Sequence, residues 1–275
     1  MFKKLIFFTL AIGLLASCGG NKNQSEGAEG MAQFADDQAF KDAHDTPEAN
    51  DHQAQGQMVT FATPDGAEGS AYALMTTTAS NKYLFVIHEW WGLNDHIKEE
   101  ADRLFAELGD VNVMALDMYD GQVATSPDEA GKFMQAVKAE RAEAIVKGAI
   151  AKAGAAAKIG TIGWCFGGGW SLRSSIMAAD QGVACVIYYG MPVQKAEELA
   201  PLKAEMLGIF AEKDGWINPE VVGKFEDLAK ATGKKIEVHQ YDAEHAFANP
   251  SNPAFNETAA SDANAKALAF LKARL

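Results

Sequence analysis

The sequence is poor in cysteine and in cationic residues. Three cysteines in 275 residues are too few for a framework of disulfide bonds. The 24 Lys and Arg against 37 Asp and Glu give a formal net charge of -13, which argues against binding nucleic acid and against docking on anionic lipid by charge. Hydrophobic residues make up 48% of the chain, enough for one sizeable core. We therefore expect a single large domain that binds no nucleic acid.

The N-terminus carries an apolar stretch that is too short to cross a bilayer comfortably. Residues 5–16 follow Lys3 and Lys4 and suit the core of a signal peptide. The tetrapeptide LASC that ends at Cys18 resembles the lipobox of bacterial lipoproteins. This resemblance implies that residues 1–17 are a signal peptide and that Cys18 is lipidated. The alternative is an ordinary secretory signal in which Cys18 is incidental.

A lipidated Cys18 would hold the protein on a lipid bilayer, because several acyl chains anchor far more firmly than one. We therefore expect a lipid-anchored protein of the bacterial cell envelope, outside the cytoplasm and facing the periplasm or the cell surface. Residues 19–57 are small, polar and acidic, so we expect residues 18–57 to form the lipidated cysteine and an acidic tether. Within the tether, residues 31–44 could form a helical turn or more that packs Phe34 and Phe40 on the domain, and the sequence leaves this open.

From residue 58 to 275, short β-rich runs alternate with longer helical ones. MVTF and SAYALMTT predict two strands of an antiparallel edge. The sequence SPDE from Ser126 predicts the start of one helix that reaches about Lys152. The alternation predicts an α/β fold, with a mostly parallel central sheet and helices on both faces. Strands buried on both faces are predicted at residues 83–88, 111–117, 157–163, 183–190, 206–211 and 235–242.

Ligands of such sheets bind at the carboxyl ends of the strands, and the stretch IGTIGWCFGGGW places a cysteine at one of them. Residues 163–167, GWCFG, match the nucleophile elbow G-x-S-x-G with cysteine in place of serine. Cys165 would lie at a helix N-terminus, which favours a thiolate and lowers the pKa of the thiol. The alternative is a buried structural cysteine beside a glycine-rich packing seam.

A nucleophilic thiol also needs a histidine and an acid, in the chain order nucleophile, acid, histidine. Asp214 follows the predicted strand 206–211, and His245 follows the last predicted strand. Asp242 and Glu244 are alternative acids, but they are so close in sequence to His245 that reaching its far ring nitrogen would be awkward. The sequence therefore predicts a triad of Cys165, His245 and Asp214.

From about residue 57 to the C-terminus, the sequence resembles the dienelactone hydrolase family. The resemblance rests on VIHEWWGLN, LDMYDG, GWCFGGGW, EKDGW and HAFANPSNPAFN. It implies an α/β-hydrolase fold and cleavage of an ester or lactone through a Cys-His-Asp triad. It also implies that Glu89 contacts the thiol and helps to deprotonate it, and that the backbone N–H groups of Phe166 and Trp90 form the oxyanion hole.

The sequence departs from this family at two positions. Members that cleave dienelactones hold the substrate carboxylate with two arginines, and the matching positions here are Gly121 and Asn249. Charge-assisted contacts of this kind are strong, so their loss favours a neutral ester or lactone. The alternative to a hydrolase is a lipoprotein binding module that keeps the fold without turnover.

Aromatic residues gather in the loops at the presumed active end, and we expect four to line the substrate pocket: Trp91, Tyr119, Trp216 and Phe247. Trp164 and Trp170 are expected to be packing residues, and His88 to hydrogen-bond the backbone. Cys185 lies in a buried strand and is expected to behave as a small hydrophobic residue. The histidine spacing and the glycine-rich stretch do not match a metal site or a phosphate-binding loop. We therefore expect no metal and no cofactor, and a monomer.

Overall fold

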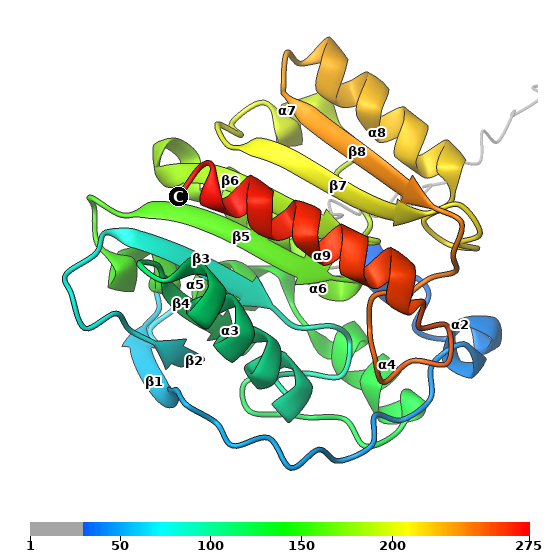
Figure 1. Ribbon diagram of the computed structural model, residues 1–275, viewed down its shortest axis with the longest axis horizontal. Helices are drawn as coiled ribbons and strands as arrows, with labels where there is room; N and C mark the ends of the chain where they lie inside the picture. Colours follow the sequence, from blue (N-terminus) through cyan, green and yellow to red (C-terminus); the bar gives the residue numbers. More distant parts are fainter. Residues whose placement is uncertain (1–29) are drawn as a thin grey trace, which may run out of the picture.

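The computed structural model describes residues 30–275 (Figure 1). The predicted signal peptide, residues 1–17, and the predicted lipidation site, Cys18, lie outside the described residues. Within the described part of the chain, no helix combines the length and the hydrophobicity needed to span a membrane.

An eight-stranded sheet runs through the centre of the domain, in the order β1-β2-β4-β3-β5-β6-β7-β8 (Figure 1). The pairs β1–β2 and β2–β4 are antiparallel, and all other neighbouring strands are parallel. The antiparallel edge and the mostly parallel sheet are therefore confirmed. The strands are β1 (Gln57–Ala62), β2 (Glu68–Leu74), β3 (Lys82–Ile87), β4 (Asn112–Leu116), β5 (Lys158–Trp164), β6 (Gly182–Tyr188), β7 (Glu205–Ala211) and β8 (Ile236–Tyr241).

Helices cover both faces of the sheet, as predicted. In Figure 1, α3 (Asp95–Leu108) and α9 (Glu257–Lys272) lie in front of the sheet and contact each other. On the opposite face, α5 (Ala139–Ala153) contacts α6 (Phe166–Ala178). The remaining helices are α2 (Gln38–Asp42), α4 (Pro127–Ala136), the 3-10 helix η1 (Ala179–Gln181), α7 (Ala196–Leu199) and α8 (Pro219–Ala231).

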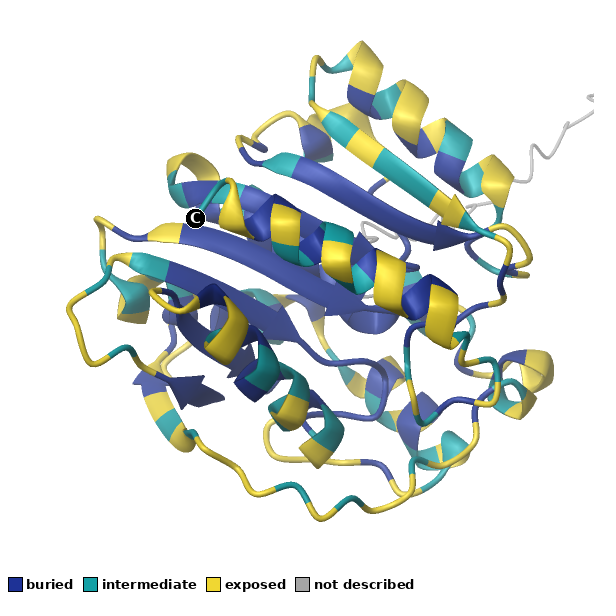
Figure 2. Cartoon of the chain, viewed as in Figure 1, coloured by how far each residue is buried: buried dark blue, intermediate teal, exposed yellow. Residues whose placement is uncertain are grey.

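The core lies between the central strands and these helices. Figure 2 shows β3, β5 and β7 almost wholly buried. The prediction that residues 235–242 form a strand buried on both faces is wrong, because no residue of β8 is fully buried. In the described part of the chain β8 pairs only with β7, so it is an edge strand. Its polar residues alternate with half-buried Ile236 and Val238.

The predicted helix from Ser126 to about Lys152 is two helices. Its start is as expected, because the Ser126 side chain accepts a hydrogen bond from the Glu129 N–H and Pro127 occupies the first turn. The chain then becomes extended at Val137 and begins α5 at Ala139. The two parts pack on different partners, since α4 contacts α2 whereas α5 contacts β1, β2 and α6. One straight helix could not satisfy both sets of contacts.

Residues 31–44 of the acidic segment are packed on the domain, which is one of the two outcomes that the sequence left open, whereas residues 45–57 are exposed or half-buried. Phe40 is fully buried in α2, Phe34 is partly buried, and the Asp37 side chain caps the helix by accepting from the Ala39 N–H. Further along, the carbonyl of Glu48 accepts from His96 on α3. The segment has few apolar residues, but Met31, Ala35 and Phe40 are buried. The structure therefore shows this segment packed on the domain.

Candidate active site

Cys165 lies at a tight turn between β5 and α6. Its φ is +54°, a backbone conformation that costs a non-glycine residue free energy and is common at functional sites. A Cβ at Gly163 would lie 2.1 Å from the carbonyl oxygen of Gly167, and a Cβ at Gly167 would lie 2.2 Å from the carbonyl oxygen of Ile87. Only glycine therefore fits at either position, and the backbone is that of the elbow predicted from GWCFG.

The loops after β7 and β8 bring Asp214 and His245 together. Nδ1 of His245 donates to Oδ2 of Asp214 at 2.6 Å. The other oxygen, Oδ1, accepts from the backbone N–H groups of Trp216 and Ile217, each at 2.8 Å. These three hydrogen bonds fix both the carboxylate and the imidazole, and they leave Nε2 of His245 with no hydrogen-bond partner among residues 30–275.

Asp214 and His245 also set each other's ionisation. Burial alone would lower the pKa of His245, but the Asp214 carboxylate raises it above its ordinary value, with a further contribution from Cys165. Burial alone would raise the pKa of Asp214, and the charge and hydrogen bond of His245 instead hold that pKa low. Asp214 therefore stabilises the protonated imidazole, which is the form that His245 takes when it accepts a proton.

Cys165 is 1% exposed, and it is close enough to His245 for each group to shift the pKa of the other. The prediction of a lowered thiol pKa is wrong for this structure. Burial raises the pKa of the Cys165 thiol, and His245 and the Phe166 N–H oppose this without cancelling it. Desolvation of a thiolate is costly, and here it outweighs the helix N-terminus.

Glu89 lies in the loop after β3 and is buried. Its Oε2 accepts from Nδ2 of Asn249 at 2.5 Å, whereas Oε1 has no partner in the described part of the chain. Burial raises the pKa of Glu89 to about 7, against smaller opposing effects of His245 and Asn249. The carboxylate contributes to the raised pKa of Cys165, so the two groups are neighbours, although no hydrogen bond joins them.

The two backbone N–H groups predicted for the oxyanion hole lie on adjoining loops. Phe166 is the first residue of α6, and its N–H is among the groups that lower the pKa of Cys165. Trp90 lies in the loop after β3, which packs so closely on the elbow that a Cβ at Gly167 would lie 2.5 Å from the carbonyl oxygen of His88. The structure thus brings the two loops together at Cys165.

The predicted pocket residues separate into different environments. Trp91 lines a cavity of about 480 Å³ beside Glu89 and Asn249. Trp164, predicted to be a packing residue, also lines this cavity, although its ring packs against Tyr188 as well. Tyr119 lies at a separate cavity of about 160 Å³.

Phe247 is 0% exposed, so its prediction as a pocket residue is wrong. Its ring is fully buried between Tyr189 and Tyr241, with centroid distances of 5.6 and 5.2 Å, and it belongs to the core below the loop. The other two packing predictions agree with the structure. Trp170 packs against Phe166, and Cys185 is buried in β6.

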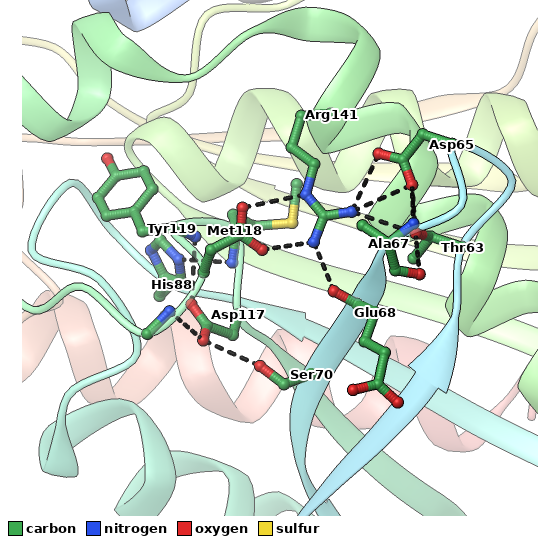
Figure 3. Close-up of polar contacts among 12 residues, drawn as sticks. Thr63, Asp65, Ala67, Glu68, Ser70, His88, Asp117, Met118, Tyr119 and Arg141 are labelled. Atoms are coloured by element: carbon green, nitrogen blue, oxygen red, sulfur yellow. Dashed lines mark hydrogen bonds and ion pairs between the residues drawn. The ribbon is translucent and has the colours of Figure 1, made fainter.

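Arg141 and Asp117 organise the loop after β4, at the position of one missing family arginine (Figure 3). Asp117 accepts from Ser70 Oγ at 3.0 Å and from the Gly121 N–H at 2.6 Å, so Gly121 is a turn glycine with φ of +91°. Arg141 forms ion pairs with Asp65 and Asp120 at 3.0 and 2.5 Å. Its guanidinium is therefore engaged and does not replace the missing arginine.

His88 has the backbone role expected of it. Its Nδ1 donates to the carbonyl of Glu89 at 2.5 Å, and its Nε2 accepts from the Met118 N–H at 3.1 Å (Figure 3). This pattern requires a neutral ring, and burial correspondingly lowers the pKa of His88. Among residues 30–275, no group of three or more His, Cys, Asp and Glu side chains could hold a metal ion.

The N-terminal segment covers the site, which the sequence did not reveal. The ring of Phe40 lies 5.6 Å from that of His245 and 5.0 Å from those of Trp90 and Trp216. Trp216, predicted to line the pocket, packs on this ring and donates from Nε1 to Asp37 at 3.0 Å. The only sequence signal was the presence of aromatic residues in an otherwise polar, acidic stretch.

Unpaired polar atoms are concentrated around Cys165. Seven buried side-chain polar atoms in the described residues have no hydrogen-bond partner, a state that costs about 1–3 kcal/mol per group. All but Ser174 Oγ belong to residues of the site: His44, Glu89, Trp90, Tyr119, Tyr189 and His245. Such a cluster is typical of a site whose polar groups are reserved for a reacting molecule.

The mostly parallel sheet, the strand–elbow–helix unit and the Asp–His pair after β7 and β8 define an α/β-hydrolase fold. The sequence matches the model of the Dienelactone hydrolase family over residues 70–275. This chain therefore belongs to the dienelactone hydrolase family, whose members are hydrolases.

Individual relatives agree with this assignment. The chain is 32% identical over 230 residues to Protein usf of Aquifex pyrophilus, covering 79% of this chain and 98% of that protein. It is 23% identical over 227 residues to carboxymethylenebutenolidase 1 of Cupriavidus pinatubonensis, covering 78% of this chain and 95% of that protein. A dienelactone hydrolase-like promiscuous phosphotriesterase from metagenomic libraries has the same fold, with a TM-score of 0.68, 21% identity, and coverage of 79% of this chain and 98% of that one.

Proposed function

We propose that this protein hydrolyses a neutral ester or lactone through a triad of Cys165, His245 and Asp214. The observation that carries the proposal is the arrangement of the three groups in the loops that follow β5, β7 and β8. In support, Nδ1 of His245 donates to Asp214 at 2.6 Å, and Nε2 has no hydrogen-bond partner among residues 30–275. Cys165 is also near enough to this imidazole to contribute to its raised pKa.

In the first half of the reaction, the Cys165 thiol transfers its proton to Nε2 of His245, and the sulfur attacks the carbonyl carbon. The backbone N–H groups of Phe166 and Trp90 stabilise the oxyanion that develops. His245 then protonates the leaving alkoxide, which departs as the alcohol and leaves a thioester on Cys165. In a lactone the alcohol stays joined to the acyl group.

Glu89 assists the first proton transfer. Its hydrogen bond from Asn249 orients the carboxyl group, and the ionised carboxylate attracts the positive charge that His245 gains when it takes the thiol proton.

The cavity favours a neutral substrate. Arg103 is the only cationic Lys or Arg side chain in its lining, and Arg103 is engaged by Glu100 at 2.6 Å and Glu107 at 3.0 Å. Asn249, at the second missing arginine position, is likewise engaged by Glu89. A substrate carboxylate would thus lack a charged partner in this cavity, which costs several kcal/mol when the charge is buried.

The test is hydrolysis of paired p-nitrophenyl esters, one neutral and one bearing a carboxylate, by wild type and Cys165→Ala. Cys185→Ala is the matched control, because Cys185 is equally buried but lies in β6. We expect Cys165→Ala to lose activity by about 10³-fold or more, Cys185→Ala to keep it, and the neutral ester to be preferred. Equal activity of wild type and Cys165→Ala would overturn the hydrolase proposal in favour of a binding module.

We further propose that lipidated Cys18 anchors the protein to the bacterial envelope, as a lipoprotein with its domain outside the cytoplasm. The support is the order of Lys3, Lys4, the apolar stretch 5–16 and LASC. Detergent phase partitioning of wild type and Cys18→Ser tests this. Wild type should enter the detergent phase and Cys18→Ser the aqueous phase, whereas identical partitioning would contradict lipidation.

A further inference from the structure

The segment before β1 is fixed over the site by polar contacts around Phe40. Lys41 forms an ion pair with Asp128 on α4 at 2.7 Å. The carbonyl of Ala43 accepts from Asn252 in the loop before α9 at 3.3 Å. Together these contacts hold residues 40–44 against α4 and the loop before α9.

His44 is the polar residue that this segment places in the site. It is 4% exposed, and its ring centroid lies 4.8 Å from that of Trp90 and 5.6 Å from that of His245. Its Nδ1 donates to the carbonyl of Phe40 at 2.7 Å. Because a neutral imidazole has one N–H, Nε2 carries the lone pair, and this atom has no hydrogen-bond partner among residues 30–275.

The ring of His44 is also held neutral. Burial lowers the pKa of His44 to about 3, with a further contribution from His245. Its Nε2 is therefore an acceptor throughout the range in which His245 takes up and releases protons. Within the described residues no hydrogen bond uses this acceptor, and leaving it unpaired in the core destabilises the fold.

We propose that His44 is part of the active site, and that its Nε2 accepts a hydrogen bond from the water that hydrolyses the thioester on Cys165. This inference rests on the proposed function, because it concerns the second half of the same reaction. A water molecule has two hydrogens to place. His245 removes one, and in a site closed by Phe40 and Trp216 the other needs an acceptor, which His44 supplies.

Hydrolysis of the thioester on Cys165 consumes one water molecule. The water oxygen forms a bond to the thioester carbonyl carbon while one water proton moves to Nε2 of His245. The carbon–sulfur bond then breaks, its electron pair remains on the sulfur, and His245 returns the proton to Cys165. The carboxylic acid leaves with the second water hydrogen, which stays hydrogen-bonded to His44 until product departs.

The experiment compares His44→Gln with His44→Met, two unbranched side chains of similar size. Glutamine keeps an acceptor oxygen near the position of Nε2, and methionine does not. Formation and decay of the acyl-enzyme are followed separately with a neutral p-nitrophenyl ester, by release of p-nitrophenol and by intact-protein mass spectrometry. We expect His44→Met to slow decay about tenfold or more while formation changes less than about threefold, and His44→Gln to remain near wild type in both.

His52→Gln is the control for a structural role of the segment, since His52 donates to Asp102 at 2.8 Å on α3, away from the thiol. It should leave both rates unchanged. Thermal denaturation shows whether His44→Met is stable enough to assay. If it is not, His44→Leu replaces it. Unchanged decay in the apolar variant, or equal slowing of formation and decay in both His44 variants, overturns the role of His44. Cys165→Ala tests the proposed nucleophile independently. The acyl-enzyme should be absent from this variant, and its persistence would contradict Cys165 as the nucleophile.

Discussion

Replacing Glu89 with glutamine should make the protein more stable at pH 8 and change its stability little at pH 5. Burial raises the pKa of Glu89 from 4.5 to about 7, so the folded state binds this proton more tightly than the unfolded state. The group therefore favours folding most below pH 4.5, and its contribution weakens as the pH rises to 7. Above pH 7 the full cost of an ionised, buried carboxylate is present.

The magnitude follows from the size of the shift. A rise from 4.5 to about 7 at 1.36 kcal/mol per pKa unit gives about 3 kcal/mol above pH 7, and less than about 1 kcal/mol at pH 5. Glutamine resembles the protonated carboxyl group and can still accept from Asn249. It does not ionise, so the variant avoids this cost.

Urea unfolding of wild type and Glu89→Gln at several values between pH 5 and 8 measures the difference. The variant should gain stability over wild type as the pH rises from 5 to 8, by about 2.5 kcal/mol. Glu226→Gln, at an exposed position of α8, is the control and should show no such trend. Equal stability of Glu89→Gln and wild type at pH 8 would refute the argument that Glu89 is desolvated.

Three further outcomes follow from the packing. Phe40→Ala should speed alkylation of Cys165 by iodoacetamide about tenfold or more, because Phe40 covers His245 and Trp90 beside the thiol. Peptide mapping with Phe255→Ala as control measures this, and an unchanged rate would show that Phe40 does not limit access. Gly163→Ala should lower the free energy of unfolding by about 2 kcal/mol or more, because the added methyl group would clash with the backbone of Gly167. Urea unfolding measures this, and stability equal to wild type would contradict the elbow geometry. Arg141→Met should cost about 1 kcal/mol in the same assay and spare ester hydrolysis, whereas loss of activity would assign Arg141 to the site.

The fold and the elbow could be predicted because their signals are local. The glycines at 163 and 167 flank Cys165 directly, and the strand before it is continuously apolar. The order of Cys165, Asp214 and His245 was enough to expect that they meet, since parallel strands end at one edge of the sheet. The structure places Asp214 and His245 in hydrogen-bonding contact.

The remaining features depend on contacts that are distant in sequence. The pKa of the Cys165 thiol is raised by burial, and part of the cover over its site is Phe40, which comes from a segment of mostly polar composition. Likewise, the apolar residues of β8 are compatible with a central strand, and only the sheet order shows that β8 is an edge. Phe247 could be assigned to a loop from the sequence, but not to the core side of that loop.

If Cys18 anchors the protein, as proposed, the docking of residues 31–44 limits how far the domain could move from the bilayer. With Cys18 as the proposed anchor, only residues 19–29 separate the lipid from the docked segment. A fully extended chain spans at most about 3.6 Å per residue, so this leash reaches roughly 40 Å. A free tether running to residue 57 would reach more than three times as far. If Cys18 is the anchor, as proposed, the docking of Phe40 would thus keep the segment that covers the site within roughly 40 Å of the membrane surface.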